Sequence, residues 1–198
     1  MKMNALALLI FSSMTCMAWA EDLSTPALEA PSYSPTGLYL GGGLGYGVTY
    51  VTDDNASTDD DGFVVNPTLG YLFTKNWGLE IGYTNLPEVK AGDTALLNSV
   101  YDLDMAVKGI LPINNYLQVF GKVGIAYLSY ESGDVGAEVN DHWVNPNTSV
   151  TTWVPLFAGG VSYMIKPNLA LSIQETATVA VDSAPSTYTT TIGLTHIF

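Results

Sequence analysis

The sequence predicts an all-β protein, an eight-stranded antiparallel up-and-down transmembrane β-barrel. Three observations lead to this fold class. Large apolar and small residues alternate with a period of two from Gly37 onward, and residues 1–20 have the pattern of an export signal. Charged residues make up only 13% of the chain, against 47% hydrophobic residues. Soluble domains carry about 25% charged residues, so a water-soluble globule is a poor match.

The composition also excludes two classes of site. The chain has 6 lysines and no arginine against 19 acidic residues, which gives a net charge of −13. Nucleic-acid binding is built from clustered Lys and Arg, so we expect no nucleic-acid partner. The single cysteine, Cys16, excludes a disulfide framework and a cysteine metal site.

Residues 1–20 are predicted to be a cleaved signal peptide. Lys2 provides the positive start, residues 5–11 provide the apolar stretch, and Ala18 and Ala20 fit the small-x-small cleavage rule. The apolar stretch is too short for a membrane anchor. A lipoprotein cut before Cys16 is the alternative, although the residues before that cysteine match a lipidation signal poorly.

The mature chain is then expected to begin with a flexible segment, residues 21–36. Pro26, Pro31 and Pro35 lie there among small and acidic residues. Such a composition disfavours both helix and strand. The barrel domain is predicted to follow at residues 37–198.

The strands of this domain follow from the alternation. They are expected near residues 38–50, 63–73, 77–84, 102–109, 117–127, 153–163, 169–174 and 188–198. Short turns at 74–76, 113–115 and 165–167 alternate with longer loops near 51–61, 87–98 and 131–149 and a shorter one at 182–185. Short turns at one end and longer loops at the other are typical of a bacterial outer-membrane barrel.

The composition of the two strand faces decides which face points outward. One face is apolar and ends in Trp, Tyr or Phe on most strands, whereas the other is mostly Gly, Ala, Ser and Thr. A water-facing surface needs many charged residues, while a narrow barrel interior has room only for small side chains. The apolar face is therefore predicted to face lipid. A soluble lipocalin-like barrel or sandwich is the alternative.

The C-terminus supports export to the outer membrane. The chain ends with aromatic Phe198, and Leu194, Ile192 and Tyr188 lie on the same alternating face. This resembles the recognition signal of bacterial outer-membrane proteins, so Phe198 is predicted to act in assembly by the barrel-assembly machinery. His196 departs from that pattern, which usually has Tyr or an apolar residue there.

The whole region 37–198 resembles the OmpA-like family of eight-stranded outer-membrane barrels. The similarity lies in GLYLGGGLG at 37–45 and in the hairpin from AVKGILP at 106–112 to VFGKVG at 119–124. It implies a barrel in the outer membrane of a Gram-negative cell envelope, with outer-membrane lipids and lipopolysaccharide as partners. The peptidoglycan-binding domain of full-length members is not expected. Activity does not follow, because such barrels serve as anchors, adhesins, stability factors or narrow pores.

The predicted loops hold most of the acidic residues, and only one lysine, Lys90. These acids are Asp53, Asp54, Asp59, Asp60, Asp61, Glu88, Asp93, Glu131, Asp134, Glu138, Asp141 and Asp182. They form a solvated face, or they bind divalent cations at the lipopolysaccharide surface or an extracellular host ligand. No metal site is expected, since Thr58 stands where a calcium-binding loop needs glycine.

Five charged residues fall on the small-residue face and are predicted to form an interior charge network: Glu80, Asp102, Asp104, Lys108 and Lys122. The parity of two strands joined by a short turn places Lys108 and Lys122 directly opposite or diagonal to each other. They would repel unless a carboxylate lay between them, and Glu80 and Asp104 are available. The network is either a salt-bridge plug or a gate for a narrow path.

Glu175 does not fit the alternation. Strict alternation points it toward lipid, which is costly at depth. The residue therefore lies near the headgroups, or its strand carries a β-bulge.

These observations predict a structural or surface-interaction role, adhesin-like or in membrane integrity, for a barrel with a largely plugged lumen. A narrow, porin-like pore for small solutes or ions is the alternative. An outer-membrane enzyme is a third hypothesis, which rests on His142 beside Asp141 in the longest loop. No nucleophile elbow or paired carboxylates accompany them, so no catalytic or cofactor-binding residue is expected.

Overall fold

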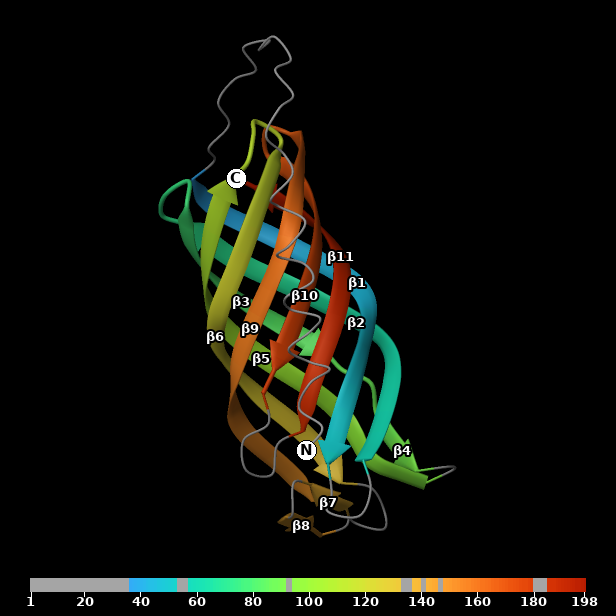
Figure 1. Ribbon diagram of the computed structural model, residues 1–198. Coiled ribbons are helices and arrows are strands. Elements are labelled where there is room, and N and C mark those ends of the chain that lie inside the picture. The colour runs from blue at the N-terminus through green and yellow to red at the C-terminus, as the bar shows by residue number, and fades with distance from the viewer. Residues whose placement is uncertain are drawn as a thin grey trace, which may run out of the picture. The chain divides into compact units, whose positions relative to one another are not determined.

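The chain forms a closed antiparallel barrel in the computed structural model (Figure 1), which describes residues 36–52, 57–91, 94–132, 137–139, 142–145, 148–179 and 185–198. The predicted signal peptide, with Ala18 and Ala20, and residues 21–35 lie outside the described residues. No helix within the described ranges has the length and hydropathy needed to span a bilayer.

Eight long strands make up the wall of the barrel. They are β1 (Gly37–Thr52), β2 (Ser57–Leu72), β3 (Trp77–Asn85), β5 (Thr94–Pro112), β6 (Leu117–Ser132), β9 (Ser149–Lys166), β10 (Leu169–Thr178) and β11 (Ser186–Ile197). Each pairs with the next along the chain, and pairing of β1 with β11 closes the sheet. The predicted eight-stranded up-and-down barrel is therefore confirmed.

The longer strands extend beyond the predicted ones at the loop end. β2 begins at Ser57, so Asp59, Asp60 and Asp61 lie on a strand and not in a loop as expected. The predicted second loop contains β4 (Val89–Ala91) and the start of β5, and the third contains the hairpin of β7 (Ala137–Val139) and β8 (His142–Val144). Alternation marks only the lipid-facing part of a strand, whereas backbone pairing continues into water.

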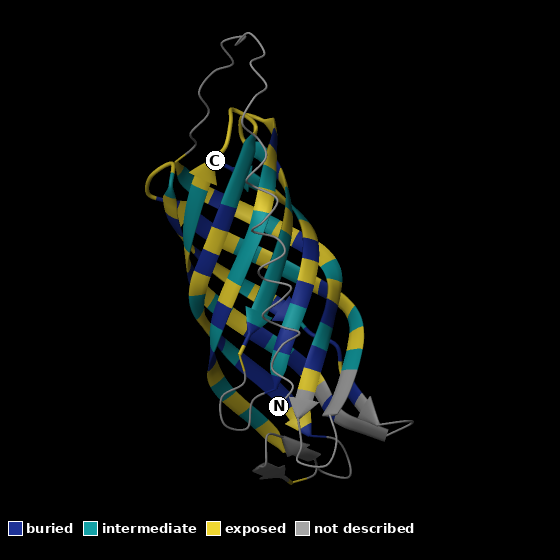
Figure 2. Ribbon diagram, in the orientation of Figure 1, coloured by how far each residue is buried: buried dark blue, intermediate teal, exposed yellow. Residues whose placement is uncertain are grey.

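The apolar face of each strand points outward, as predicted. Val123 and Trp153 are 61% and 59% exposed on the barrel wall, whereas Ala126 and Val154, on the other face of the same two strands, are buried inside. Figure 2 shows the resulting alternation of exposed and buried residues along the strands. Large apolar side chains exposed around a barrel need a lipid environment, because in water they would form an extensive aggregation-prone surface.

Aromatic side chains lie on the outer surface toward both ends of the barrel. Tyr116 and Tyr163 stack near the short turns with a centroid distance of 6.1 Å, and Tyr127 and Trp153 pack toward the loops at 5.1 Å. Two aromatic girdles flanking an apolar band are the usual boundary of a membrane barrel.

Part of the interior at the loop end is apolar, which was not predicted from the sequence, and it lies beside buried hydroxyls such as those of Thr178 and Thr187. The connection between β3 and β4 folds inward, with Leu86 and Val89 buried and Thr49 Oγ1 donating to the carbonyl oxygen of Pro87 at 3.4 Å. We call this group the loop-end cluster; its buried members are Leu86, Val89, Leu97, Val100, Ala106, Ala126, Leu128, Tyr130, Val154 and Leu156. It fills the lumen where the strands rise toward the loops.

Glu175 lies on the outer face without a bulge. It pairs opposite Thr190 on β11 and Gly159 on β9, and the register of β10 with β9 shifts only between Leu169 and Ala170. Of the two alternatives, the bulge is therefore excluded at this residue. The Tyr188 hydroxyl donates a hydrogen bond to the Glu175 carboxylate, which reduces the cost of an acid on this face.

Candidate functional site

Glu80 on β3 is the centre of a charged cluster inside the barrel. Its side chain is 2% exposed and accepts from three partners. Lys108 Nζ lies 3.2 Å from Oε2, Lys122 Nζ donates to Oε1, and the Tyr39 hydroxyl donates to Oε2 at 2.7 Å. Four strands, β1, β3, β5 and β6, thus meet at one carboxylate.

The register of β5 and β6 explains why this carboxylate is needed. Lys108 lies directly opposite Lys122, one of the two arrangements that the short turn allowed. Two ammonium groups at such a position repel each other. Glu80 offers one oxygen to each lysine, so the repulsion becomes a pair of charge-assisted hydrogen bonds.

Tyr39 reaches Glu80 because a glycine lies between them. Tyr39 pairs with Gly70, and Gly70 pairs with Glu80, so the three residues cross β1, β2 and β3 in one row. A Cβ on Gly70 would lie 2.2 Å from Cζ of Tyr39. The tyrosine ring therefore lies flat over the glycine, and any larger residue would displace it.

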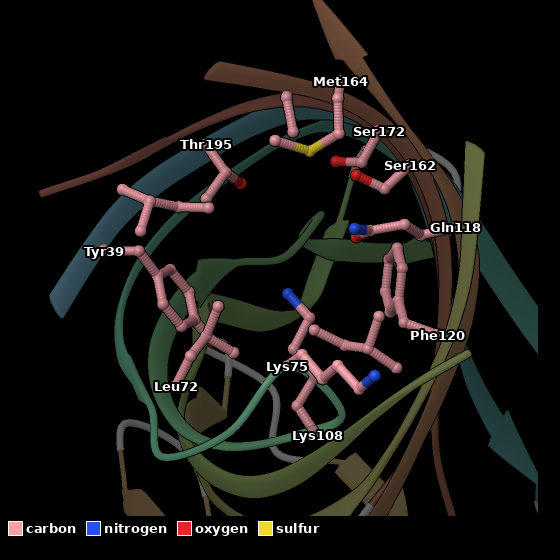
Figure 3. A pocket seen from close by; sticks show the side chains of 13 residues that line it. Tyr39, Leu72, Lys75, Lys108, Gln118, Phe120, Ser162, Met164, Ser172 and Thr195 are labelled. Atoms are coloured by element: carbon pink, nitrogen blue, oxygen red, sulfur yellow. The ribbon is translucent and has the colours of Figure 1, made fainter. Parts of the chain in front are cut away.

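Phe120 on β6 completes the cluster from the opposite wall. β1 and β6 are separated by three strands in either direction around the closed sheet. Lys108 Nζ lies 5.0 Å from the ring centre of Tyr39 and 4.7 Å from that of Phe120, so cation–π contacts link both walls. Figure 3 shows the two rings on opposite sides of the lumen. We call Tyr39, Glu80, Lys108, Phe120 and Lys122 the lumen plug.

Asp102 and Asp104 lie beyond the plug toward the loops. Asp102 is buried opposite Thr84, and its Oδ1 has no hydrogen-bond partner. Asp104 lies opposite Gly82, and a Cβ there would meet the Asp104 carboxylate at 2.4 Å. In the described part of the chain, neither carboxylate lies within salt-bridge distance of a lysine. The structure therefore brings together Glu80, Lys108 and Lys122, and places the two aspartates beside them.

Tyr39 and Phe120 are not among the site residues predicted from the sequence. Tyr39 is the one large side chain on an inner face of β1 that otherwise carries glycine from residue 41 to 47. A large aromatic residue on a glycine face signals a ring that lies across neighbouring glycines. Phe120 similarly faces Gly160, where a Cβ would meet its ring at 2.6 Å.

Phe198 lies at the end of the barrel wall. Its backbone N–H donates to the carbonyl oxygen of Leu38 at 2.9 Å, and its ring packs edge-on against His196 with a centroid distance of 4.6 Å. The side chain is 70% exposed, so it contributes little to packing within the barrel. Its role in assembly remains a prediction.

Much of the acidic loop region lies outside the described residues, including Asp53, Asp54, Asp93, Asp134, Asp141 and Asp182. Within the described part, the Tyr46 hydroxyl donates to the Asp61 carboxylate on the outer face. No group of three or more His, Cys, Asp or Glu side chains in that part is arranged to hold a metal ion. For His142 only the strand position, in β8, is described.

Replacing Glu80 tests whether the plug charges depend on one another. Glu80→Ala leaves Lys108 and Lys122 facing each other without their carboxylate. Removing one partner of a buried ion pair costs about 3–5 kcal/mol, so we expect the free energy of unfolding to fall by that amount. Urea unfolding of the barrel in detergent micelles measures it, with Asp59→Ala at the loop end of β2 as control. Equal midpoints for both variants would show that the charges are not coupled.

Replacing Gly70 tests the close approach of Tyr39. Gly70→Ala places a methyl group against the tyrosine ring and displaces its hydroxyl from Glu80. Overpacking of this kind costs about 1–3 kcal/mol. Gly42→Ala is the matched control, since a Cβ on Gly42 meets no heavy atom within 4 Å. The urea midpoint of unfolding in detergent micelles should fall for Gly70→Ala and not for Gly42→Ala. An equal fall in both variants would contradict the close packing of the Tyr39 ring against Gly70.

Several solved structures share this architecture. Neisserial surface protein A is 14% identical over 82% of this chain and 98% of its own, with a TM-score of 0.64. Ail of Yersinia pestis is 16% identical over 82% of this chain and 99% of its own, with a TM-score of 0.52. OprG of Pseudomonas aeruginosa is 14% identical over 84% of this chain and 99% of its own, with a TM-score of 0.52. At such identities the similarity shows the fold alone.

Among curated proteins, none matches the sequence. The family model described as the outer membrane protein beta-barrel domain matches residues 5–198, which is nearly the whole chain. Together with the closed eight-stranded sheet and its lipid-facing apolar surface, this match shows that the chain belongs to the outer membrane protein beta-barrel domain family and is located in the bacterial outer membrane.

Proposed function

We propose that this protein is a non-conducting barrel with a structural or surface-interaction role in the outer membrane. One observation carries the proposal: the lumen is closed at two levels. The lumen plug crosses it within the membrane, and the loop-end cluster fills it toward the loops. A barrel closed in this way serves to anchor and display its extracellular end.

The lumen plug is charged and the loop-end cluster is mainly apolar, and each is a separate barrier to an ion. The plug holds Glu80 and Lys122 almost fully buried, so opening it would break a buried ion pair. The loop-end cluster consists mainly of apolar side chains packed inside the barrel, and apolar constrictions resist wetting. An ion would have to pass both.

The displayed surface is acidic, which bears on its partner. The strands of the β1–β2 hairpin continue to Thr52 and Ser57 and carry Asp59, Asp60 and Asp61 on β2. Ail of Yersinia pestis has been solved in complex with a heparin analogue, sucrose octasulfate, but acidic loops repel such a polyanion. Here the expected extracellular partners are lipopolysaccharide bridged by divalent cations, or a cationic host surface. Insertion would depend on the barrel-assembly machinery.

A narrow pore for small solutes or ions is the second candidate. The observation in its favour is a cavity inside the lumen at the short-turn end, bordered by Lys75, Ser162 and Thr195. This cavity reaches Tyr39, Lys108 and Phe120 of the plug. A conducting path would require both the plug and the loop-end cluster to rearrange.

Conductance in planar lipid bilayers separates the two candidates. We expect the refolded wild-type protein to show no channel events. Because the two closures act in series, Glu80→Ala alone and Leu128→Ala alone should also remain silent, whereas the double variant should conduct. Retention of the folded gel mobility before boiling shows that each variant is folded. Wild-type conductance would overturn the proposal in favour of a pore.

The role of Phe198 is tested in cells. Its exposed side chain predicts a small change in the stability of the folded barrel but a large loss of outer-membrane insertion for Phe198→Ser. The amount of protein in the outer-membrane fraction measures insertion, and urea unfolding of protein refolded in detergent measures stability. Phe73→Ser, at another exposed aromatic residue near a short turn, is the control. Equal outer-membrane levels of wild type and Phe198→Ser would exclude a recognition role.

A further inference from the structure

The short-turn half of the lumen contains a cavity that ends at the plug. Its volume is about 40 Å³, and Tyr39, Lys108 and Phe120 border it. A buried water needs roughly 10–15 Å³ on the same measure, so the cavity has room for a small polyatomic group. Figure 3 shows its lining side chains pointing into the lumen from the surrounding strands.

The polar groups of this cavity are mainly hydrogen-bond donors. They belong to Lys75, Lys108, Gln118, Ser162, Ser172 and Thr195, beside the Tyr39 hydroxyl that donates to Glu80, and no carboxylate lines the cavity. Apolar side chains such as Leu72, Met164 and Ile197 line the rest. An ammonium group has three donors and no acceptor, and a hydroxyl can turn its proton toward an anion. Lys108 also makes its ion pair with Glu80, which lies outside the cavity lining. The lysine ammonium groups of the lining are therefore complementary to a ligand group that supplies only acceptors.

The placement of the lysines strengthens this argument. The chain has only 6 lysines and a net charge of −13. Lys75 and Lys108 line the cavity, and Lys122 lies in the plug that borders it. Within the described residues, Glu80 is the carboxylate that pairs with lysines here. An acidic protein thus concentrates half of its cations around one small cavity.

We propose that this cavity binds a small oxoanion, the carboxylate or phosphate group of a solute that enters from the short-turn side. Such a group is small and accepts charge-assisted hydrogen bonds from lysine ammonium groups, and Lys75 and Lys108 both line the cavity. Lys75 lies in the turn after β2 and is exposed, so it contacts the anion from the mouth of the cavity. The site requires no conduction and is independent of the proposed surface role.

Methyl NMR of the full barrel in lipid nanodiscs tests the proposal. Met164 lines the cavity, whereas Met105 is exposed on the lipid-facing wall. Inorganic phosphate and acetate are titrated separately at constant ionic strength, with chloride as the replaced anion. We expect a saturable shift of the Met164 methyl resonance with at least one of the two anions and no shift at Met105. The anion that saturates identifies which oxoanion the cavity prefers.

Two lysine variants at the same end of the barrel supply the comparison. Lys75→Gln should weaken binding about fivefold, since it removes one charge-assisted hydrogen bond worth about 1 kcal/mol at an exposed position. Lys166→Gln, at the end of β9 and outside the cavity lining, should leave binding unchanged. Non-saturating shifts with both anions, or equal effects of the two variants, would overturn the proposal, because either result indicates only a diffuse response to ions.

Discussion

Closure of the sheet by the pairing of β1 with β11 is the constraint on which the rest of the structure depends. Inside a bilayer every backbone N–H and C=O must find a partner within the protein, so an open sheet edge is not tolerated. Twelve residue pairs from Tyr39↔Ile197 to Tyr50↔Ser186 make this closure continuous. Once the sheet is closed, each strand has one face toward lipid and one toward a narrow lumen. The face with large apolar residues then contacts lipid, and the face with small residues lines the lumen.

The narrow lumen determines how its large side chains are placed. Tyr39 lies over Gly70 and Phe120 lies over Gly160, so each ring occupies the space that a side chain on the neighbouring strand would need. With both rings in place, the Lys108 ammonium lies between them and pairs with Glu80. The glycines of the inner face therefore do more than leave the interior empty. They make room for a polar cluster that spans the barrel.

The two ends of the lumen differ in the side chains that line them, and each end favours a different function. Toward the loops the interior resembles a small soluble core, built by Leu86, Val89 and residues from β5, β6 and β9. Toward the short turns a small cavity is bordered by lysines and hydroxyls and by apolar side chains of a second buried cluster, among them Leu72, Met164 and Ile197. The plug separates these two halves. A closed loop end favours a role in anchoring and display, while the lysines that border the cavity at the other end favour binding of an anionic group.

The sequence by itself determined the fold class, the outward face and the strand order, because a period of two combined with few charges leaves only one stable arrangement in lipid. It also identified Glu80, Lys108 and Lys122, since charges on a small-residue face are conspicuous. The tertiary structure decided how these residues meet. A long predicted loop separated β3 from β5, so only the register Glu80↔Ala106 placed the carboxylate beside both lysines. Tyr39 and Phe120 reach the cluster through contacts between distant strands, and the loop-end cluster forms where pairing continues past the lipid-facing alternation. Periodicity describes one strand at a time, whereas these contacts depend on several strands in register around a closed barrel.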